Sequence, residues 1–227
     1  MPPALVVEDL GPAAYEPTLR LQMERLEEVR TRTDGRGYLL LVEHDPPVIT
    51  RGAGASDAHI LATPGQLRAE GVQLHTVRRG GDVTYHGPGQ LVAYPILRID
   101  RRGKDIHAYL RDLEEAIIRT LARVGIEGRR QEGFTGVWVP TEPPAKIAAI
   151  GVGVRRWVSY HGLALNVQPI MRHFGLIVPC GLAGKPVTSV AEQLGRDVSV
   201  SRMKPLLVQS LADVLGMETQ PPTPGQP

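Results

Sequence analysis

One cysteine and one lysine have the residue types and sequence surroundings of reactive groups. Cys180 is the only cysteine in the chain, and it stands between Pro179, where an apolar run ends, and a glycine. We expect this position to be a chain corner, where catalytic groups are commonly presented. A cysteine thiolate is a nucleophile, whereas a lone cysteine can also be an inert buried side chain. The residues alone leave both interpretations open, and one cysteine excludes an internal disulfide and a cysteine-based metal cluster.

Lys146 is the second of these groups, and it belongs to a chain that otherwise uses arginine for most of its 26 basic residues. It follows a rigid Pro143-Pro144 corner and begins an apolar segment in which Ala149 and Gly151 are small. A lysine at an exposed strand edge is a common solubility device. The small side chains beside it, however, would leave room for a ligand along the strand. The pattern therefore leaves a structural and a functional role open.

A glycine-rich segment, residues 78–90, lies between two apolar runs and reads RRGGDVTYHGPGQ. Its four glycines permit close approach of the backbone to a ligand and offer accessible N–H groups. It is neither a P-loop nor a dinucleotide-binding fingerprint. A plain hairpin connection needs about two to five residues, and it would have no use for Arg79, Thr84, Tyr85, His86 and Gln90. We therefore predict that this segment binds a ligand.

The histidines give a weaker signal. His161 and Gly162 precede an apolar run, and His161 can be either a satisfied structural histidine or a ligand-binding one. Five other histidines show no metal-ligand spacing and are left without a role: His44, His59, His75, His107 and His173.

The elements that must position these groups alternate between helical and extended patterns. Helical spacing predicts helices over 17–31, 105–124, 189–194 and 203–215. Apolar runs predict strands at 37–44, from 72, from 91, at GVWVP, at KIAAIGVGV and at WVSYHGLALNV. This mixture predicts a single α/β (α+β) domain with a mixed sheet over residues 1–218. The proline-rich tail, 219–227, is expected to be disordered.

Composition limits the protein's class. The chain has 227 residues, 42% hydrophobic and 22% charged, which is ordinary for one globular domain. A net charge of +2 without a basic arm does not indicate nucleic-acid binding. Because no apolar run approaches a membrane span and the first residues do not form a signal peptide, we expect a cytoplasmic protein without a membrane partner. A monomer is expected.

These segments closely resemble the lipoyl(octanoyl) transferase family of lipoate biosynthesis. The matching motifs are RGGDVTYHGPGQLVAYP at Arg79–Pro95, GVWV from Gly136, KIAAIGV from Lys146, SYHGLALNV from Ser159 and PCG from Pro179. A looser match, EHDPPVITRG, begins at Glu43. The resemblance covers roughly residues 39–194 and implies the mixed-sheet fold of biotin protein ligase and lipoate ligase catalytic domains.

The resemblance also assigns roles. Cys180 matches the acyl-thioester nucleophile, and Lys146 matches the lysine that lowers the pKa of its thiol and acts as general acid and base. The substrate-binding positions are Arg79, Gly80, Gly81, Asp82, Val83, Thr84, Tyr85, His86, Ala149, Ile150, Gly151, Gly162, Leu163 and Ala164. We expect the acyl tail to lie among Val83, Ile150 and Leu163.

The implied partners are octanoyl-acyl carrier protein as donor and lipoyl domains as acceptors. These are the lipoyl domains of 2-oxoacid dehydrogenase complexes and the glycine cleavage H protein. No cofactor and no metal are implied, and no ATP is required because a thioester is already activated.

Three rival functions stay open. An ATP-dependent lipoate or biotin ligase would share the fold but would need no cysteine nucleophile. A non-catalytic acyl-binding protein would bind octanoate reversibly whether or not Cys180 is present. A cysteine hydrolase would need a Cys-His-Asn arrangement, which the sequence does not clearly offer.

Overall fold

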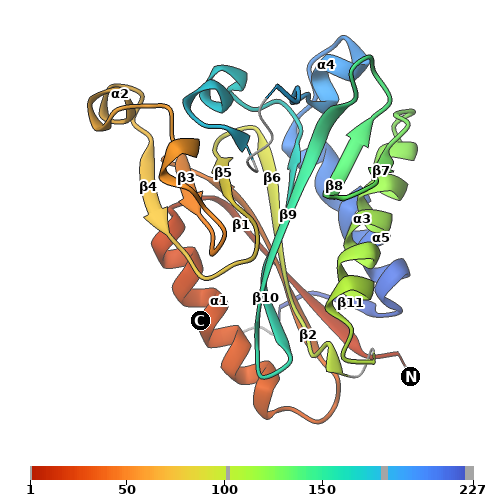
Figure 1. The fold of residues 1–227 in the computed structure, drawn as a ribbon. Helices are drawn as coiled ribbons and strands as arrows, with labels where there is room; N and C mark the ends of the chain where they lie inside the picture. Colours follow the sequence, from red (N-terminus) through yellow and green to blue (C-terminus); the bar gives the residue numbers. More distant parts are fainter. Residues whose placement is uncertain (1, 101–102, 180–183, 223–227) are drawn as a thin grey trace.

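The fold is built on an eight-stranded mixed sheet, seen nearly edge-on in the computed structural model of Figure 1. The structure describes residues 2–100, 103–179 and 184–222. The strand order is β11-β1-β2-β6-β10-β9-β8-β7. Strand β1 pairs parallel with β2 and β11, and the other neighbours are antiparallel. The strands are β1 (Ala4–Ala13), β2 (Gly37–His44), β6 (Gln90–Ile96), β7 (Arg129–Gln131), β8 (Phe134–Val139), β9 (Ala145–Arg155), β10 (Val158–Asn166) and β11 (Glu218–Gln220).

Helices cover both faces of this sheet. On one face α1 (Tyr15–Thr31) packs Leu26 and Val29 against β2 and β6. On the other face α3 (Ile106–Ala122) and α5 (Val200–Leu215) enclose the larger core cluster, and Figure 1 shows α1 and this helix pair on opposite sides. Burial of apolar side chains on both faces is the main stabilising contribution to such a fold.

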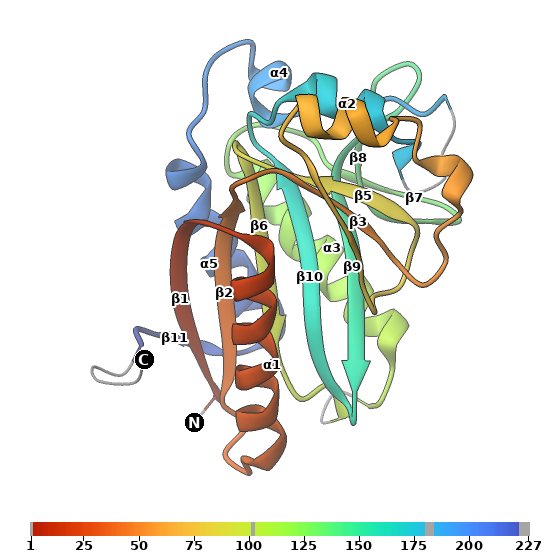
Figure 2. The same ribbon diagram turned by 90° about the vertical axis from the view of Figure 1, so that its left-hand side faces the viewer.

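A second, three-stranded sheet lies over one end of the large sheet, and Figure 2 shows it crossing in front of β9 and β10. Its order is β4-β3-β5, with β3 (Val48–Arg51) parallel to β4 (Gln73–Thr76) and antiparallel to β5 (Val83–His86). Short helices α2 (Pro64–Ala69) and α4 (Val190–Leu194) complete the fold.

The predicted fold class is confirmed, but strands β1, β3 and β7 were not predicted, and other elements differ locally. Strand β5 lies inside the glycine-rich segment that we expected to be a loop, because its β-branched and aromatic residues pair with β3. Helix α5 begins before residue 203, since the Ser199 side chain accepts a hydrogen bond from the Arg202 N–H and caps the helix. The tail expected from Thr219 begins with β11, where Thr219 pairs with Leu5; residues 223–227 lie outside the described chain.

Within the described residues, none of the helices combines the length and hydropathy needed to cross a membrane.

Candidate active site

A cavity of about 210 Å³ lies between the small sheet and the face of the large sheet that α1 covers. Its floor is made of small residues on two neighbouring strands: Ala149 pairs with Ala164, and Gly151 pairs with Gly162. Ile150 and Leu163 also line it, and both pack with the larger core cluster on the α3 side of the sheet. Because the floor residues are small, the floor leaves space along β9 and β10 that suits an alkyl chain.

The glycine-rich segment forms a wall of the cavity, and the alternation of a strand decides which of its side chains take part. Thr84 and His86 line the cavity. Val83 and Tyr85 point to the other face of β5, where they are fully buried in a separate core cluster with Ile49. The acyl tail therefore cannot contact the Val83 side chain as we expected.

The residues of this segment that precede β5 also differ in whether they line the cavity. Arg79, Gly81 and Asp82 line the cavity. Gly80 lies instead along the edge of β9, where its N–H donates to the Val152 carbonyl at 2.9 Å.

Arg79 is a buried cation at one end of the cavity, with 7% of its surface exposed. Its Nη2 donates to the carbonyl and hydroxyl oxygens of Thr50, both at 2.9 Å, and its Nη1 donates to the Gly80 carbonyl at 3.0 Å. These bonds fix the guanidinium in one position and satisfy it in a buried environment.

His86 is held as a neutral imidazole by a chain of amides. The Nε2 of Gln90 donates to Asn166 Oδ1 at 2.9 Å, so its Oε1 is the acceptor that faces His86 Nδ1 at 2.7 Å. His86 therefore donates from Nδ1 and keeps Nε2 as an acceptor. Burial lowers its pKa to about 3. Asn166 Nδ2 donates in turn to the Thr188 carbonyl at 3.0 Å, so the chain reaches the segment that pairs with Lys146.

His161 also lines the cavity, at a strained position in β10. Its φ is +55°, which is uncommon for a residue other than glycine. Its N–H donates to the Gln22 side chain at 2.8 Å, and only 3% of the residue is exposed. Burial, followed by the nearby charge of Arg79, lowers its pKa to about 3. His161 therefore faces the cavity as a neutral group, which favours the ligand-binding interpretation.

Lys146 is buried at the start of β9, with 6% of its surface exposed, and lines the cavity. Its N–H donates to the Pro186 carbonyl and its own carbonyl accepts from Thr188, both at 2.9 Å. The Nζ lies 5.5 Å from the centroid of the Trp138 ring, within cation–π range. This burial excludes the interpretation of Lys146 as a surface solubility device.

Cys180, the predicted nucleophile, lies outside the described residues. The described chain leads to it through a 3₁₀ segment, Met171–Leu176. Ile177 then forms a bridge with Ile60, and the Val178 N–H donates to the His59 carbonyl at 2.8 Å.

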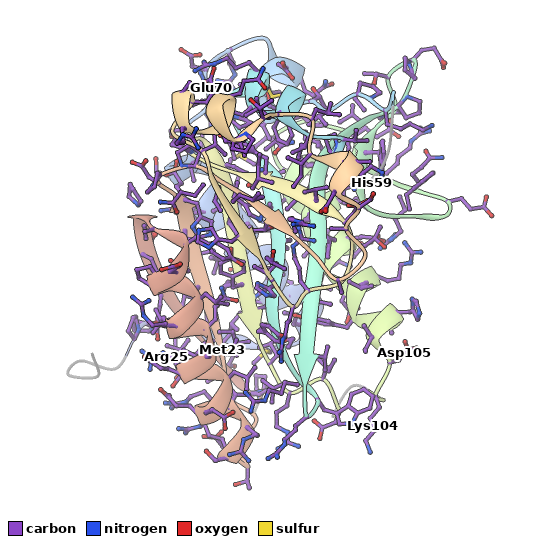
Figure 3. The ribbon with its side chains drawn as sticks, turned by 60° about the vertical axis from the view of Figure 1, so that its left-hand side comes forward. Met23, Arg25, His59, Glu70, Lys104 and Asp105 are labelled. Carbon is purple, nitrogen blue, oxygen red and sulfur yellow. The ribbon has the colours of Figure 1, made fainter. Side chains whose placement is uncertain are left out.

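Several cavity residues were missed by the sequence analysis. Tyr15, Thr50 and Tyr94 line the cavity from α1, β3 and β6, and residues 133–135 line it from the β7–β8 turn and the start of β8. Thr50 and Tyr94 lie within the motifs that begin at Glu43 and Arg79, but these motifs do not show that the two side chains reach the cavity, which depends on packing of distant segments. His59, labelled in Figure 3 beside the small sheet, was left without a role, yet its Nδ1 lies 2.5 Å from Asp82 Oδ2.

Comparison with known proteins identifies the family. Residues 14–212 match the model of the lipoyl protein ligase A/B catalytic domain. The chain belongs to this family. Among its relatives in the lipoyl protein ligase A/B family, an octanoyltransferase of Chloroflexus aurantiacus is 45% identical over 94% of this chain and 95% of the relative. An octanoyltransferase of Gloeobacter violaceus is 48% identical over 92% and 87%. The predicted family resemblance is confirmed.

Solved structures agree on the fold. A bipartite lipoate protein ligase with its E2 lipoyl domain from Thermoplasma acidophilum aligns with a TM-score of 0.76 at 17% identity, covering 99% of this chain and 88% of that one. A biotin protein ligase from Aquifex aeolicus, in complex with biotin and ATP, aligns with a TM-score of 0.53 at 12% identity, covering 93% and 70%. At these identities the likeness concerns the fold alone.

Proposed function

We propose that this chain transfers an octanoyl or lipoyl group from acyl carrier protein, through a thioester on Cys180, to a lysine of a lipoyl domain. The observation that carries the proposal is a buried lysine, Lys146, at a cavity with a floor of small residues. It occurs in a chain whose octanoyltransferase relatives match it over nearly its whole length. The acceptors proposed are the lipoyl domains of 2-oxoacid dehydrogenase complexes and the glycine cleavage H protein.

The first half-reaction forms the acyl-enzyme. Proton transfer from the Cys180 thiol to Lys146 gives a thiolate and an ammonium, and the ammonium stabilises the thiolate. The thiolate attacks the carbonyl carbon of the carrier thioester, and the bond from that carbon to the carrier sulfur breaks. The departing carrier thiolate takes the proton from Lys146, which is left neutral.

The second half-reaction forms the amide. The neutral lysine of the lipoyl domain attacks the Cys180 thioester, and its surplus proton passes to Lys146. The carbon–sulfur bond to Cys180 breaks, which restores the thiolate–ammonium pair. Because a thioester is already activated toward amines, neither step needs ATP.

In this scheme the acyl tail extends along the floor made by Ala149, Gly151, Gly162 and Ala164, while the Ile150 and Leu163 side chains pack with the larger core cluster. We propose that the protein is cytoplasmic, since a reactive thiol is maintained in a reducing compartment. We also propose that it is a monomer.

The test is to incubate the purified protein with octanoyl-acyl carrier protein, without ATP, and to record its intact mass before and after hydroxylamine. The proposal expects an octanoyl adduct that hydroxylamine removes and that Cys180→Ala never forms. If product appears only when ATP and free octanoate are supplied, the ATP-dependent ligase is the correct function. Reversible octanoate binding without an adduct, unchanged in Cys180→Ala, would instead indicate an acyl-binding protein.

A further inference from the structure

Arg79 separates the acyl cavity from a second cleft. This cleft, of about 690 Å³, is lined in part by Arg78, Val152, Val154 and Tyr160. Arg79 lines both spaces. Strand β9 runs from one to the other, so that residues 149–151 lie in the cavity and residues 152–154 lie in the cleft.

The side chain of Arg79 is enclosed by two glycines. A Cβ atom added to Gly151 would lie 3.1 Å from Arg79 Cδ, and one added to Gly52 would lie 2.8 Å from Arg79 Nη1. The guanidinium is also held by its bonds to Thr50 and to the Gly80 carbonyl. A buried arginine fixed on several sides is a rigid partition rather than a mobile surface group.

The partition stands across the path of the acyl chain. Lys146 and Gly151 lie at the two ends of the part of β9 that lines the cavity, five residues apart. A chain whose carbonyl lies at the Lys146 end therefore extends toward Arg79. A longer apolar chain would have to displace a hydrogen-bonded cation, which is unfavourable in a buried site.

We infer that Arg79 is the residue that limits the length of the acyl chain, and that its removal joins the cavity to the second cleft. This inference rests on the proposed function, because it takes the acyl group to enter from the Lys146 end. Under this inference Arg79 acts as a physical barrier, and the barrier restricts the substrates to medium-chain acyl groups.

The experiment compares chain-length profiles of wild type and Arg79→Met. Methionine retains an unbranched side chain beside Gly151 but lacks the guanidinium that separates the acyl cavity from the second cleft. Each protein is assayed for transfer from acyl carrier protein charged with hexanoyl, octanoyl, decanoyl, dodecanoyl or tetradecanoyl groups. We expect the ratio of dodecanoyl to octanoyl transfer rates to rise about tenfold or more in Arg79→Met, the range by which pocket contacts discriminate between apolar chains.

The matched control is Arg78→Met, which removes a neighbouring exposed arginine that lines the cleft but is not among the described residues of the cavity. Its octanoyl rate and its chain-length profile should equal those of wild type. A profile in Arg79→Met that keeps the wild-type ratios overturns the inference, even if all rates fall together. An equal shift in Arg78→Met overturns it as well, because the effect would then follow charge and not the barrier.

Gly151→Ala supplies a second test, in which the chain-length preference should shift toward shorter chains. This variant tests the inference even if Arg79→Met does not fold. The added methyl group would crowd the Arg79 stem and the Gly80 carbonyl, each 3.1 Å away, and so narrow the end of the cavity. The ratio of hexanoyl to octanoyl rates should rise, whereas an unchanged ratio contradicts the inference. If the wild-type protein transfers no acyl group of any length, the proposed function itself is wrong. If the wild-type protein transfers octanoyl groups but the variants keep its chain-length profile, only the inference about Arg79 is wrong.

Discussion

Gly136 leaves the space that the Lys146 side chain occupies. A Cβ atom at position 136 would lie 2.7 Å from Lys146 Cε and 3.4 Å from its Nζ. Gly136 also adopts a φ of +119°, a conformation that side chains rarely tolerate. Its N–H donates to the fully buried Glu114 carboxylate at 3.0 Å, so the backbone of β8 is fixed at this point. The glycine of the GVWV motif thus positions the lysine of the neighbouring strand.

The first prediction follows from this contact. Gly136→Ala should displace Lys146 and lower octanoyl transfer about 100-fold, approaching the loss expected for Lys146 variants. Gly125→Ala is the matched control, since Gly125 has a φ of +84° and no described residue within 4 Å of an added Cβ. Both variants should lose about 1 kcal/mol or more of stability from backbone strain, and Gly136→Ala should lose more, because its added Cβ would also lie 2.5 Å from the Ala148 carbonyl oxygen. Only Gly136→Ala should lose activity, as measured by initial rates; equal rates in both variants would contradict the contact's role.

Lys146 itself gives the second prediction. Lys146→Ala removes the proposed proton carrier, so acylation of the protein by octanoyl-acyl carrier protein should slow about 100-fold or more. The rate is measured in a single turnover by intact mass. Lys204→Ala serves as control, because Lys204 makes a surface ion pair with Asp9 at 2.6 Å, far along the chain from the cavity residues. Unchanged acylation in Lys146→Ala would remove lysine from the mechanism.

The third prediction concerns the pH dependence of stability. Burial lowers the pKa of His44 to about 4 and those of His86 and His161 to about 3, whereas an unfolded histidine titrates near 6.5. Between these values the unfolded chain binds more protons than the folded one. The free energy of unfolding should therefore fall as the pH is lowered from about 7 to 4, by up to about 1.4 kcal/mol per pH unit for each histidine.

His161→Asn tests this dependence at one site. Asparagine does not titrate and tolerates a positive φ, so the backbone strain at +55° should not increase. Urea unfolding at several pH values should give a shallower decline for the variant than for wild type. The same slope in both proteins would show that His161 does not contribute.

The fourth prediction addresses the amide chain behind His86. Asn166→Ala removes the acceptor for Gln90 and the donor to the Thr188 carbonyl, and leaves buried polar groups without partners. Such a loss should cost about 2 kcal/mol of stability. Gln209→Ala, which removes a surface hydrogen bond to Asp213, should cost much less. Urea unfolding measures both, and similar losses would contradict the importance of the buried chain.

The sequence determined the family, the fold class and most long elements, because these depend on periodicity and on extended motifs. Strand β2 and helix α1 carry strong apolar patterns and lie close to their predicted bounds. The short strand β5 was missed, since four residues among glycines carry little local signal. Lys146 was identified from its motif, but a structural and a functional role both remained open for it until its burial was known.

Only the tertiary structure decided which side chains meet. Alternation along β5 sends Thr84 and His86 into the cavity and Val83 into a separate core, and this depends on the pairing of β5 with β3. Tyr15 lies outside every quoted motif, and Tyr94 lies within the motif of residues 79–95, where nothing in the sequence shows that its side chain lines the cavity. Arg79 could be recognised by its motif, yet its place between two clefts arises from the packing of β3 and β9 around it. A motif records which residue types a site needs, whereas distances between strands far apart in the chain are set by packing of the whole core.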